Sequence, residues 1–127
     1  MAGREVFVDT SALYPVMAER VRRLLDSGHR LVTTDYVVCE AMNLASARAG
    51  YHVGTRILEL IERSVAPRAE WIGSLRFDTS TIFYRRHSDH RYSFTDCTSF
   101  VVMQKLRIAG ALTTDEHFTE AGFQVLS

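Results

Sequence analysis

The fold of this chain is constrained most by the alternation of short β-branched runs with longer segments of helical periodicity. The run EVFVD, which begins at Glu5, is typical of a strand, and the Thr-Ser pair after it is typical of a helix N-terminus. A second strand-like run, HRLVTT, precedes a helical pattern with apolar residues at i, i+4, i+7 and i+8, namely Val37, Ala41, Leu44 and Ala45. Strands that alternate with helices form a parallel sheet covered by helices. We therefore predict an α/β fold with three layers and a central parallel sheet.

Two further helices are predicted in the first half of the chain. One begins at Ser11 and continues as an apolar stripe until Gly28, because glycine commonly follows the last turn of a helix. The other follows the interruption at Gly50 and ends before Pro67, since proline disfavours a helical conformation in the residue before it. This half of the chain is therefore expected to alternate as β-α-β-α-α.

The second half of the chain continues the alternation less regularly. The run AEWIG predicts a strand, Thr81–His87 a helix, and the polar stretch HSDHRYS a loop. Phe94–Leu106 has a helical apolar face, which Ser93 or Thr95 can cap and Gly110 can close. The run ALTT predicts another strand, followed by a polar turn, and FQVLS predicts the last strand.

The length and composition indicate one domain without a membrane segment. A chain of 127 residues has the usual size of a single domain, and 46% hydrophobic residues can supply its core, so we expect residues 1–127 to form one unit. No window approaches the ~20 consecutive apolar residues of a membrane span. The run MAGREVFVDT reaches a strand too early for a secretion signal, so we expect a cytoplasmic protein.

The two cysteines and the single tryptophan are expected in the interior. Cys39 and Cys97 are far apart in the sequence, and each stands beside an acidic residue in an apolar stretch, which favours buried, reduced thiols over a disulfide. Trp71 and the phenylalanines are expected in the core, with some of them available for a dimer interface, where aromatic residues are enriched.

Four acidic residues are expected at one edge of the predicted sheet. Asp9 ends the first strand, Glu40 follows the second strand on its helix, Asp96 opens a later helix, and Asp115 follows the run ALT. In open α/β sheets, binding sites collect beyond the carboxyl ends of the strands. Taken singly, each acid can also be a turn residue, an exposed helix position or a helix N-terminal charge. Asp89 competes with Asp96, but its polar loop HSDHRYS is expected to be solvated.

Carboxylates gathered at one edge need a compensating charge. Two unit charges 4 Å apart repel by ~4 kcal/mol at an effective dielectric near 20. Either some of the carboxyl groups keep their protons or a divalent cation binds, and an oxygen-rich pocket suits Mg²⁺ or Mn²⁺. A metal in such a pocket can activate water and offset the charge on a phosphoryl oxygen. The acids therefore predict metal-dependent hydrolysis of phosphodiester bonds.

Four sequence motifs resemble those of a known family. VDTSALY, TTDYVVCEAMN, YSFTDCTSFVVM and ALTTDEHF occur in this order and are similar to motifs of the PIN-domain family, especially to VapC-type toxins of toxin–antitoxin pairs. The resemblance implies a PIN-like α/β/α domain, an endoribonuclease that cuts single-stranded or looped RNA, a cognate VapB-type antitoxin, and a homodimer. The segment between VDTSALY and HRLVTT is shorter here than in most relatives, which bears on substrate preference, antitoxin fit and the dimer contact.

The same resemblance implies roles for individual residues. Asp9 and Asp96 are expected to contact Mg²⁺ or Mn²⁺ directly, while Glu40 and Asp115 complete the catalytic pocket through metal, water or orientation of the nucleophile. The remaining candidates flank these acids, and each also has an ordinary structural explanation. They are Ser11 and Thr113, which can bond a carboxylate or a phosphate or serve as cap and turn hydroxyls; His117, which can approach a phosphate; and Arg85, Arg86 and Arg91, which can contact RNA or be solvated.

Two other classes of function remain open from the sequence. A nucleotide hydrolase or phosphatase would need an Asp-x-Asp pair or a phosphate-binding glycine loop, and neither DxD nor GxxxxGK[ST] occurs. A catalytically silent, regulatory PIN-like module that only binds RNA would keep the fold, and a metal-dependence assay distinguishes it from a nuclease.

Overall fold

The central feature of the structure is a parallel sheet. The computed structural model describes residues 4–63 and 68–126, which contain the strands β1 (Glu5–Val8), β2 (Arg30–Thr34), β3 (Arg68–Glu70), β4 (Gly110–Leu112) and β5 (Gln124–Leu126). The strand order is β3-β2-β1-β4-β5, and each neighbouring pair is parallel. The chain builds the sheet outward from β1 in one direction and then returns to its other side with β4. This reversal places the carboxyl ends of β1 and β4 next to each other, where α/β sheets form their binding sites.

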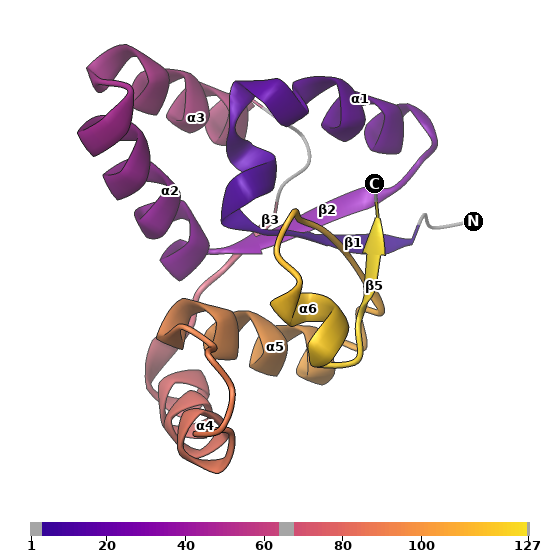
Figure 1. Ribbon diagram of the computed structural model, residues 1–127. Coiled ribbons are helices and arrows are strands. Elements are labelled where there is room, and N and C mark those ends of the chain that lie inside the picture. Colours follow the sequence, from indigo (N-terminus) through magenta and orange to yellow (C-terminus); the bar gives the residue numbers. More distant parts are fainter. Residues whose placement is uncertain (1–3, 64–67, 127) are drawn as a thin grey trace.

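Helices cover both faces of the sheet. α1 (Ala18–Asp26), α2 (Asp35–Arg48) and α3 (Tyr51–Arg63) lie on one face, and α4 (Gly73–Arg86), α5 (Phe94–Leu106) and the short α6 (His117–Glu120) on the other (Figure 1). The predicted three-layer α/β/α fold with a central parallel sheet is confirmed. No helix within the described residues has the length and apolar content needed to span a bilayer.

The core lies where the central strand meets the helices. Val6, Phe7 and Val8 of β1 are each at most 2% exposed. The ring of Phe7 lies 6.3 Å from that of Phe118, which in turn contacts Phe100 of α5 edge to face at 5.0 Å. Each fully buried side chain of this kind contributes ~1.5–3 kcal/mol relative to an exposed one. These contacts hold α5 and α6 against the sheet and so set the positions of the residues at their N-termini.

Side-chain caps define the starts of the two helices that carry candidate acids. The Thr34 hydroxyl accepts a hydrogen bond from the Val37 backbone N–H at 3.0 Å and begins α2. Ser93 begins α5 by accepting from the Asp96 backbone N–H at 3.0 Å. Of the two predicted capping residues, Ser93 and Thr95, Ser93 is therefore the one that caps the helix, and α5 has the predicted bounds.

Between β1 and α1 the chain forms two short 3-10 turns, η1 (Thr10–Leu13) and η2 (Pro15–Met17). The helix predicted from Ser11 is therefore wrong over its first turns, and the regular α-helix begins at Ala18. The tight η1 turn keeps Thr10 and Ser11 next to the end of β1. The predicted stop before Pro67 concerns a residue outside the described ones, and α3 ends at Arg63.

The segment from residue 68 to residue 86 differs from its prediction. The strand predicted over AEWIG ends at Glu70, and Trp71, predicted in the core, is 75% exposed. The reason is that the Ile72 backbone N–H donates to Asp35 Oδ1 at 2.9 Å, which turns the chain away from the sheet after the edge strand β3. The helix predicted at Thr81–His87 is the last part of the longer α4, whose polar N-terminal half carries no regular apolar stripe.

Three smaller predictions were also wrong. Gly110 does not close α5, because the helix ends at Leu106 with Arg107 in the left-handed conformation at φ 57°, and Gly110 begins β4. Cys97 is buried as predicted, whereas Cys39 is exposed because it lies on the outer face of α2. The polar turn predicted after β4 contains the one-turn helix α6, which begins at His117. Ser127 of the predicted last strand lies outside the described residues.

Candidate active site

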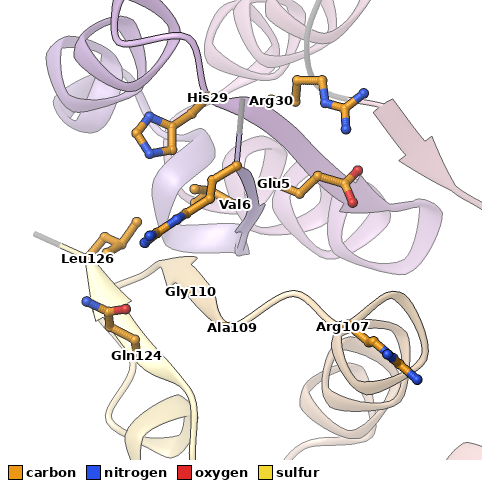
Figure 2. A pocket seen from close by; sticks show the side chains of 10 residues that line it. Glu5, Val6, His29, Arg30, Arg107, Ala109, Gly110, Gln124 and Leu126 are labelled. Atoms are coloured by element: carbon orange, nitrogen blue, oxygen red, sulfur yellow. The ribbon is translucent and has the colours of Figure 1, made fainter. Parts of the chain in front are cut away.

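The amino ends and the carboxyl ends of the parallel strands form opposite edges of the sheet and carry different side chains. At the amino ends of the strands lies a pocket of ≈440 Å³, lined by Arg30, Arg107 and Leu126 among others (Figure 2). The guanidinium groups of Arg30 and Arg107 extend in different directions, so they do not converge on one anion. The predicted acids lie at the opposite edge, beyond the carboxyl ends of the strands. The candidate site is therefore at the carboxyl edge.

Asp9 is held at the end of β1 by the neighbouring strand. Its backbone N–H donates to the carbonyl of Leu112 at 3.2 Å, which continues the pairing of β1 with β4. Its carboxylate is buried, with 5% of the residue exposed, and Oδ2 accepts a hydrogen bond from the Thr113 hydroxyl at 2.8 Å. Thr113 therefore bonds a carboxylate, which is one of the roles that the sequence left open, and the pairing of two strands sets the position of Asp9.

Asp96 is positioned by a capping box at the start of α5. The Ser93 backbone N–H donates to Asp96 Oδ2 at 3.1 Å, and the Asp96 backbone N–H donates to the Ser93 hydroxyl at 3.0 Å. These reciprocal bonds satisfy two backbone donors that a helix N-terminus leaves free. They also hold the Asp96 carboxylate at the sheet edge, largely buried.

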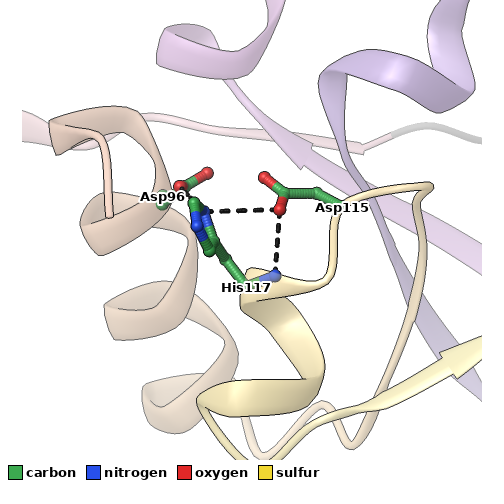
Figure 3. A group of neighbouring side chains, drawn as sticks. All are labelled: Asp96, Asp115 and His117. Carbon is green, nitrogen blue, oxygen red and sulfur yellow. Dashed lines mark hydrogen bonds and ion pairs between the residues drawn. The ribbon is translucent and has the colours of Figure 1, made fainter. Parts of the chain in front are cut away.

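Asp115 and His117 complete a compact group with Asp96. The Asp115 backbone N–H donates to the Thr113 hydroxyl at 3.0 Å, and the His117 backbone N–H donates to Asp115 Oδ1 at 2.9 Å. The His117 ring turns toward both acids, with Nδ1 3.1 Å from Asp96 Oδ2 and 3.3 Å from Asp115 Oδ1 (Figure 3). Segments far apart in the sequence thus bring these side chains together.

Glu40 joins this edge through a threonine that the sequence did not single out. The Thr10 hydroxyl donates to Glu40 Oε1 at 2.7 Å, and Thr10 follows Asp9 directly. Glu40 is partly buried on α2 and also lines a shallow pocket of ≈380 Å³ with Cys39 and Thr95. The signal that identifies Thr10 is its place in the Thr-Ser pair directly after the acid that ends β1.

Ser11 supports the site through the backbone. Its hydroxyl accepts a hydrogen bond from the Thr114 backbone N–H at 3.0 Å and lies 3.5 Å from the Thr113 hydroxyl. It does not contact a carboxylate among the interactions of the described residues. Ser11 therefore links η1 to the loop after β4, and Thr113 contacts the acid.

Burial and mutual repulsion perturb the carboxyl groups. The pKa of Asp9 is raised from 3.8 to about 6, mainly by burial. Hydrogen bonds from Thr113 and the Thr10 backbone lower this pKa, whereas the charges of Asp96 and Asp115 add to the increase. Burial also raises the pKa of Asp96, with a smaller contribution from the charge of Asp115. The site therefore carries more negative charge than its surroundings stabilise.

The charge of these acids also affects His117. Burial lowers the pKa of its imidazole, but the hydrogen bond to Asp96 and the charges of Asp115 and Asp96 outweigh burial and raise the pKa above its usual value. The buried Cys97 next to Asp96 has its pKa raised to about 11 by burial, which keeps the thiol neutral and unsuited to be a nucleophile.

Comparison with known proteins identifies the family. The model of the PIN domain matches residues 6–124, nearly the whole chain. The chain belongs to the PIN-domain family. It is 31% identical over 93 residues, 73% of this chain and 70% of the relative, to the 23S rRNA-specific endonuclease VapC20 of Mycobacterium tuberculosis, in the strains CDC 1551 / Oshkosh and H37Rv.

Solved structures of similar proteins agree with this PIN-domain fold. The crystal structure of VapC20 from Mycobacterium tuberculosis, described as a sarcin–ricin loop cleaving toxin, matches with a TM-score of 0.79 at 30% identity over 93% of this chain and 95% of that one. FitAcB from Neisseria gonorrhoeae matches with a TM-score of 0.62 at 18% identity over 96% of each chain. The second likeness concerns the fold alone.

The donor atoms in this PIN domain suit a divalent cation. Asp96, Asp115 and His117 each offer one ligand atom, and these atoms lie within 4.8 Å of one another. Asp9 and Glu40 are not part of this group among the described residues, although the charges of Asp96 and Asp115 raise the pKa of Asp9. Carboxylate oxygens bind hard divalent ions, and excess negative charge is stabilised by a cation. The residues therefore fit a divalent cation.

The predicted RNA-contacting arginines of the PIN domain lie around the loop before α5. Arg85, Arg86 and Arg91 are exposed, and Arg85 lines a pocket of ≈280 Å³ together with Tyr92. The ring of Tyr92 lies 5.4 Å from that of His117, so this pocket adjoins the acidic site. The side chain of Asp89 is 80% exposed and bonds His90, which agrees with its solvated position outside the site.

Proposed function

We propose that this chain is a metal-dependent endoribonuclease and the toxin of a toxin–antitoxin pair. The observation that carries the proposal is the convergence of donor atoms from Asp96, Asp115 and His117 within 4.8 Å, at the edge where Asp9 is buried. Membership of the PIN-domain family and the likeness to an rRNA-specific endonuclease support the same reaction. The alternative of a silent RNA-binding module is less favoured, because the four acids are all present.

The proposed cofactor is Mg²⁺ or Mn²⁺, held by Asp9, Asp96 and Asp115 with Glu40 completing the pocket. Such an ion lowers the pKa of bound water and offsets charge on the phosphoryl and leaving oxygens when it is present. The carboxylates bring the negative charge that attracts the ion to one edge of the sheet. An activity that appears only with added divalent metal is the expected result.

The hydroxyl groups around the acids have a positioning role in this proposal. Thr113 holds the Asp9 carboxylate through a hydrogen bond of 2.8 Å, and Thr10 holds Glu40 through one of 2.7 Å. Ser11 ties η1 to the Thr114 backbone at 3.0 Å. Catalytic groups act best when their neighbours fix them before substrate binds, so these bonds keep the acids in place at small cost in ordering.

The proposed substrate is a looped segment of ribosomal RNA. The relative VapC20 is described as specific for 23S rRNA and as cleaving the sarcin–ricin loop. Unpaired bases in such loops can stack on aromatic or arginine side chains. The exposed Arg85, Arg86 and Arg91, beside the Tyr92 pocket, are proposed to contact the RNA backbone next to the acids.

Further expectations about assembly are proposed with the same reaction. Residues 1–127 are proposed to act as one ribonuclease domain in the cytoplasm, to pair with a VapB-type antitoxin, and to form a homodimer. The antitoxin is expected to place an arginine against the carboxylates, where the excess negative charge can pair with it. Sizing of the purified protein alone measures the homodimer, and sizing after co-expression with a candidate VapB-type antitoxin measures the complex.

The decisive experiment compares two acids that the sequence offers as alternatives. The purified protein is incubated with a synthetic sarcin–ricin loop RNA and with a pool of small RNAs, after EDTA treatment and then with Mn²⁺ or Mg²⁺, and the cut ends are mapped. Cleavage is expected only with metal, to be lost in Asp96→Asn, and to be retained in Asp89→Asn, whose side chain is exposed. RNA binding without metal-dependent cleavage would instead establish the silent module.

A further inference from the structure

His117 faces the acids in a way that contact with a phosphate does not require. Its Nδ1 lies 3.1 Å from Asp96 Oδ2 and 3.3 Å from Asp115 Oδ1, and Figure 3 shows the ring directed between the two carboxylates. Contact with a phosphate would need only the other ring nitrogen, Nε2. The position of Nδ1 inside the donor group is therefore a separate observation.

The spacing matches neighbouring ligands on one metal ion. Ligand atoms at right angles on an ion with bonds of about 2.0–2.2 Å lie about 3 Å apart. The two distances from His117 Nδ1, 3.1 and 3.3 Å, are close to this value. In the protein without metal the same nitrogen makes the hydrogen bond to Asp96 Oδ2, so a bound ion would take the place of the proton on Nδ1. The arrangement favours a coordinating role for the nitrogen.

The orientation of the ring is fixed by its neighbours. The His117 backbone N–H donates to Asp115 Oδ1 at 2.9 Å, which ties the start of α6 to the acid. The ring contacts the buried Tyr92 edge to face at 5.4 Å and 77°, and the next residue, Phe118, is fully buried. A ligand whose orientation is set by surrounding contacts binds metal with less loss of conformational freedom.

We propose that His117 Nδ1 is a metal ligand beside Asp96 and Asp115, and that this nitrogen makes the site prefer a transition-metal ion such as Mn²⁺ to Mg²⁺. The inference rests on the proposed function, whose cofactor it specifies. Imidazole nitrogen is a good ligand for transition metals, whereas Mg²⁺ is bound mainly by oxygen atoms and keeps much of its water. Sites made only of carboxylates lack this preference.

The direct test detects nitrogen bound to the metal. Mn²⁺ is added to the protein in the absence of RNA, and electron spin echo spectroscopy records coupling of the ion to ¹⁴N. The wild-type protein is expected to show this coupling, and both His117→Phe and His117→Gln are expected to lose it. His29→Gln is the matched control, because His29 lies at the opposite edge of the sheet. Absence of ¹⁴N coupling in wild-type protein that binds Mn²⁺ would overturn the proposal.

Affinity measurements give a second test, because two roles of His117, metal ligand and neutralising cation, predict different changes in Mn²⁺ affinity when the imidazole is removed. If Nδ1 is a ligand, His117→Phe lowers Mn²⁺ affinity at least about tenfold, the scale typical when a group of a metal site is removed, and lowers Mg²⁺ affinity less. If the imidazole is only a cation that neutralises the acids, its removal leaves Mn²⁺ affinity unchanged or raises it. Titration of both metals by calorimetry separates these results.

The outcome also separates this inference from the proposed function. Wild-type protein that cleaves RNA with Mn²⁺ but shows no ¹⁴N coupling keeps the nuclease proposal and refutes the role of His117. Protein that shows ¹⁴N coupling but cleaves no RNA supports the metal ligand and refutes the nuclease. Binding of neither metal at millimolar concentration contradicts both.

Discussion

The Thr113 hydroxyl donates a 2.8 Å hydrogen bond to Asp9 Oδ2 across 104 positions of the sequence. The two residues follow β1 and β4, which are parallel neighbours at the centre of the sheet. The same hydroxyl accepts from the Asp115 backbone N–H at 3.0 Å. One threonine therefore links two candidate metal-binding acids, and its removal is expected to disturb both.

Replacement of Thr113 by valine tests this link. Thr113→Val keeps the shape of the side chain but removes the hydroxyl, so the free energy of unfolding should fall by about 2 kcal/mol, as for loss of the two hydrogen bonds with Asp9 and the Asp115 backbone. Because the bond from Thr113 lowers the pKa of Asp9, its loss should raise that pKa further. Metal-dependent cleavage should weaken and its pH profile should shift upward. Thr114→Val, at an exposed neighbouring position, serves as the control and should change neither property.

The raised pKa of Asp9 predicts how the metal-free protein responds to pH. Its pKa is raised from 3.8 to about 6, so the folded state binds the proton more tightly than the unfolded state. The stabilising contribution is fully present below about pH 4 and is lost as the pH rises through about 6. Above that pH, the buried charge lowers stability by up to about 3 kcal/mol, since one pKa unit corresponds to roughly 1.4 kcal/mol.

Asp9→Asn removes this charge while keeping an acceptor for the Thr113 hydroxyl. In EDTA, the variant should be more stable than wild type at pH 8 and should show little advantage at pH 4. Urea unfolding across this pH range measures the difference. The free energy of unfolding of the wild type should fall relative to that of Asp9→Asn as the pH rises from 4 to 8. A rise would contradict the assignment of Asp9 as a buried carboxylate repelled by its neighbours.

Asp96→Asn should separate catalysis from folding. An asparagine oxygen can still accept from the Ser93 backbone N–H, so the capping box and the helix α5 should be preserved. Loss of the charge should reduce RNA cleavage by at least about a hundredfold, the scale of removing one polar group that acts in a transition state. Added Mn²⁺ should raise the melting temperature of wild type but not of Asp96→Asn. Cleavage at the wild-type rate would refute the site.

The N-cap of α5 is predicted to affect both the stability of the protein and the position of Asp96. Ser93→Ala removes the hydroxyl that accepts from the Asp96 backbone N–H, and should lower stability by about 1 kcal/mol. It should also weaken Mn²⁺ binding, because the start of α5 that positions Asp96 loses one of its two capping bonds, although the bond from the Ser93 backbone N–H to the carboxylate remains. Thr95→Ala is the matched control, since Thr95 was the alternative cap and does not act as one. Equal losses of stability in the two variants would contradict the role of Ser93.

Periodicity predicted the parallel sheet, the helix Phe94–Leu106 and the edge at which Asp9, Glu40 and Asp115 lie. These features were predictable because a buried strand and an amphipathic helix leave different spacings of apolar residues. The first part of α4 and the exposed Trp71 were missed, since no regular apolar stripe marks the start of this helix. Cys39 was placed on the wrong face of its helix, because apolar neighbours in the sequence need not share a helix face.

The sequence by itself determined the elements, their order and the acids available to a metal, because these depend on local spacing and residue chemistry. Only the tertiary structure decided which side chains meet. Thr10 reaches Glu40 and His117 turns between Asp96 and Asp115 because strand pairing, the η1 turn and the start of α6 bring distant segments together. Contacts of that kind depend on the relative placement of packed elements, and no local pattern in the chain encodes an angle or a distance between them.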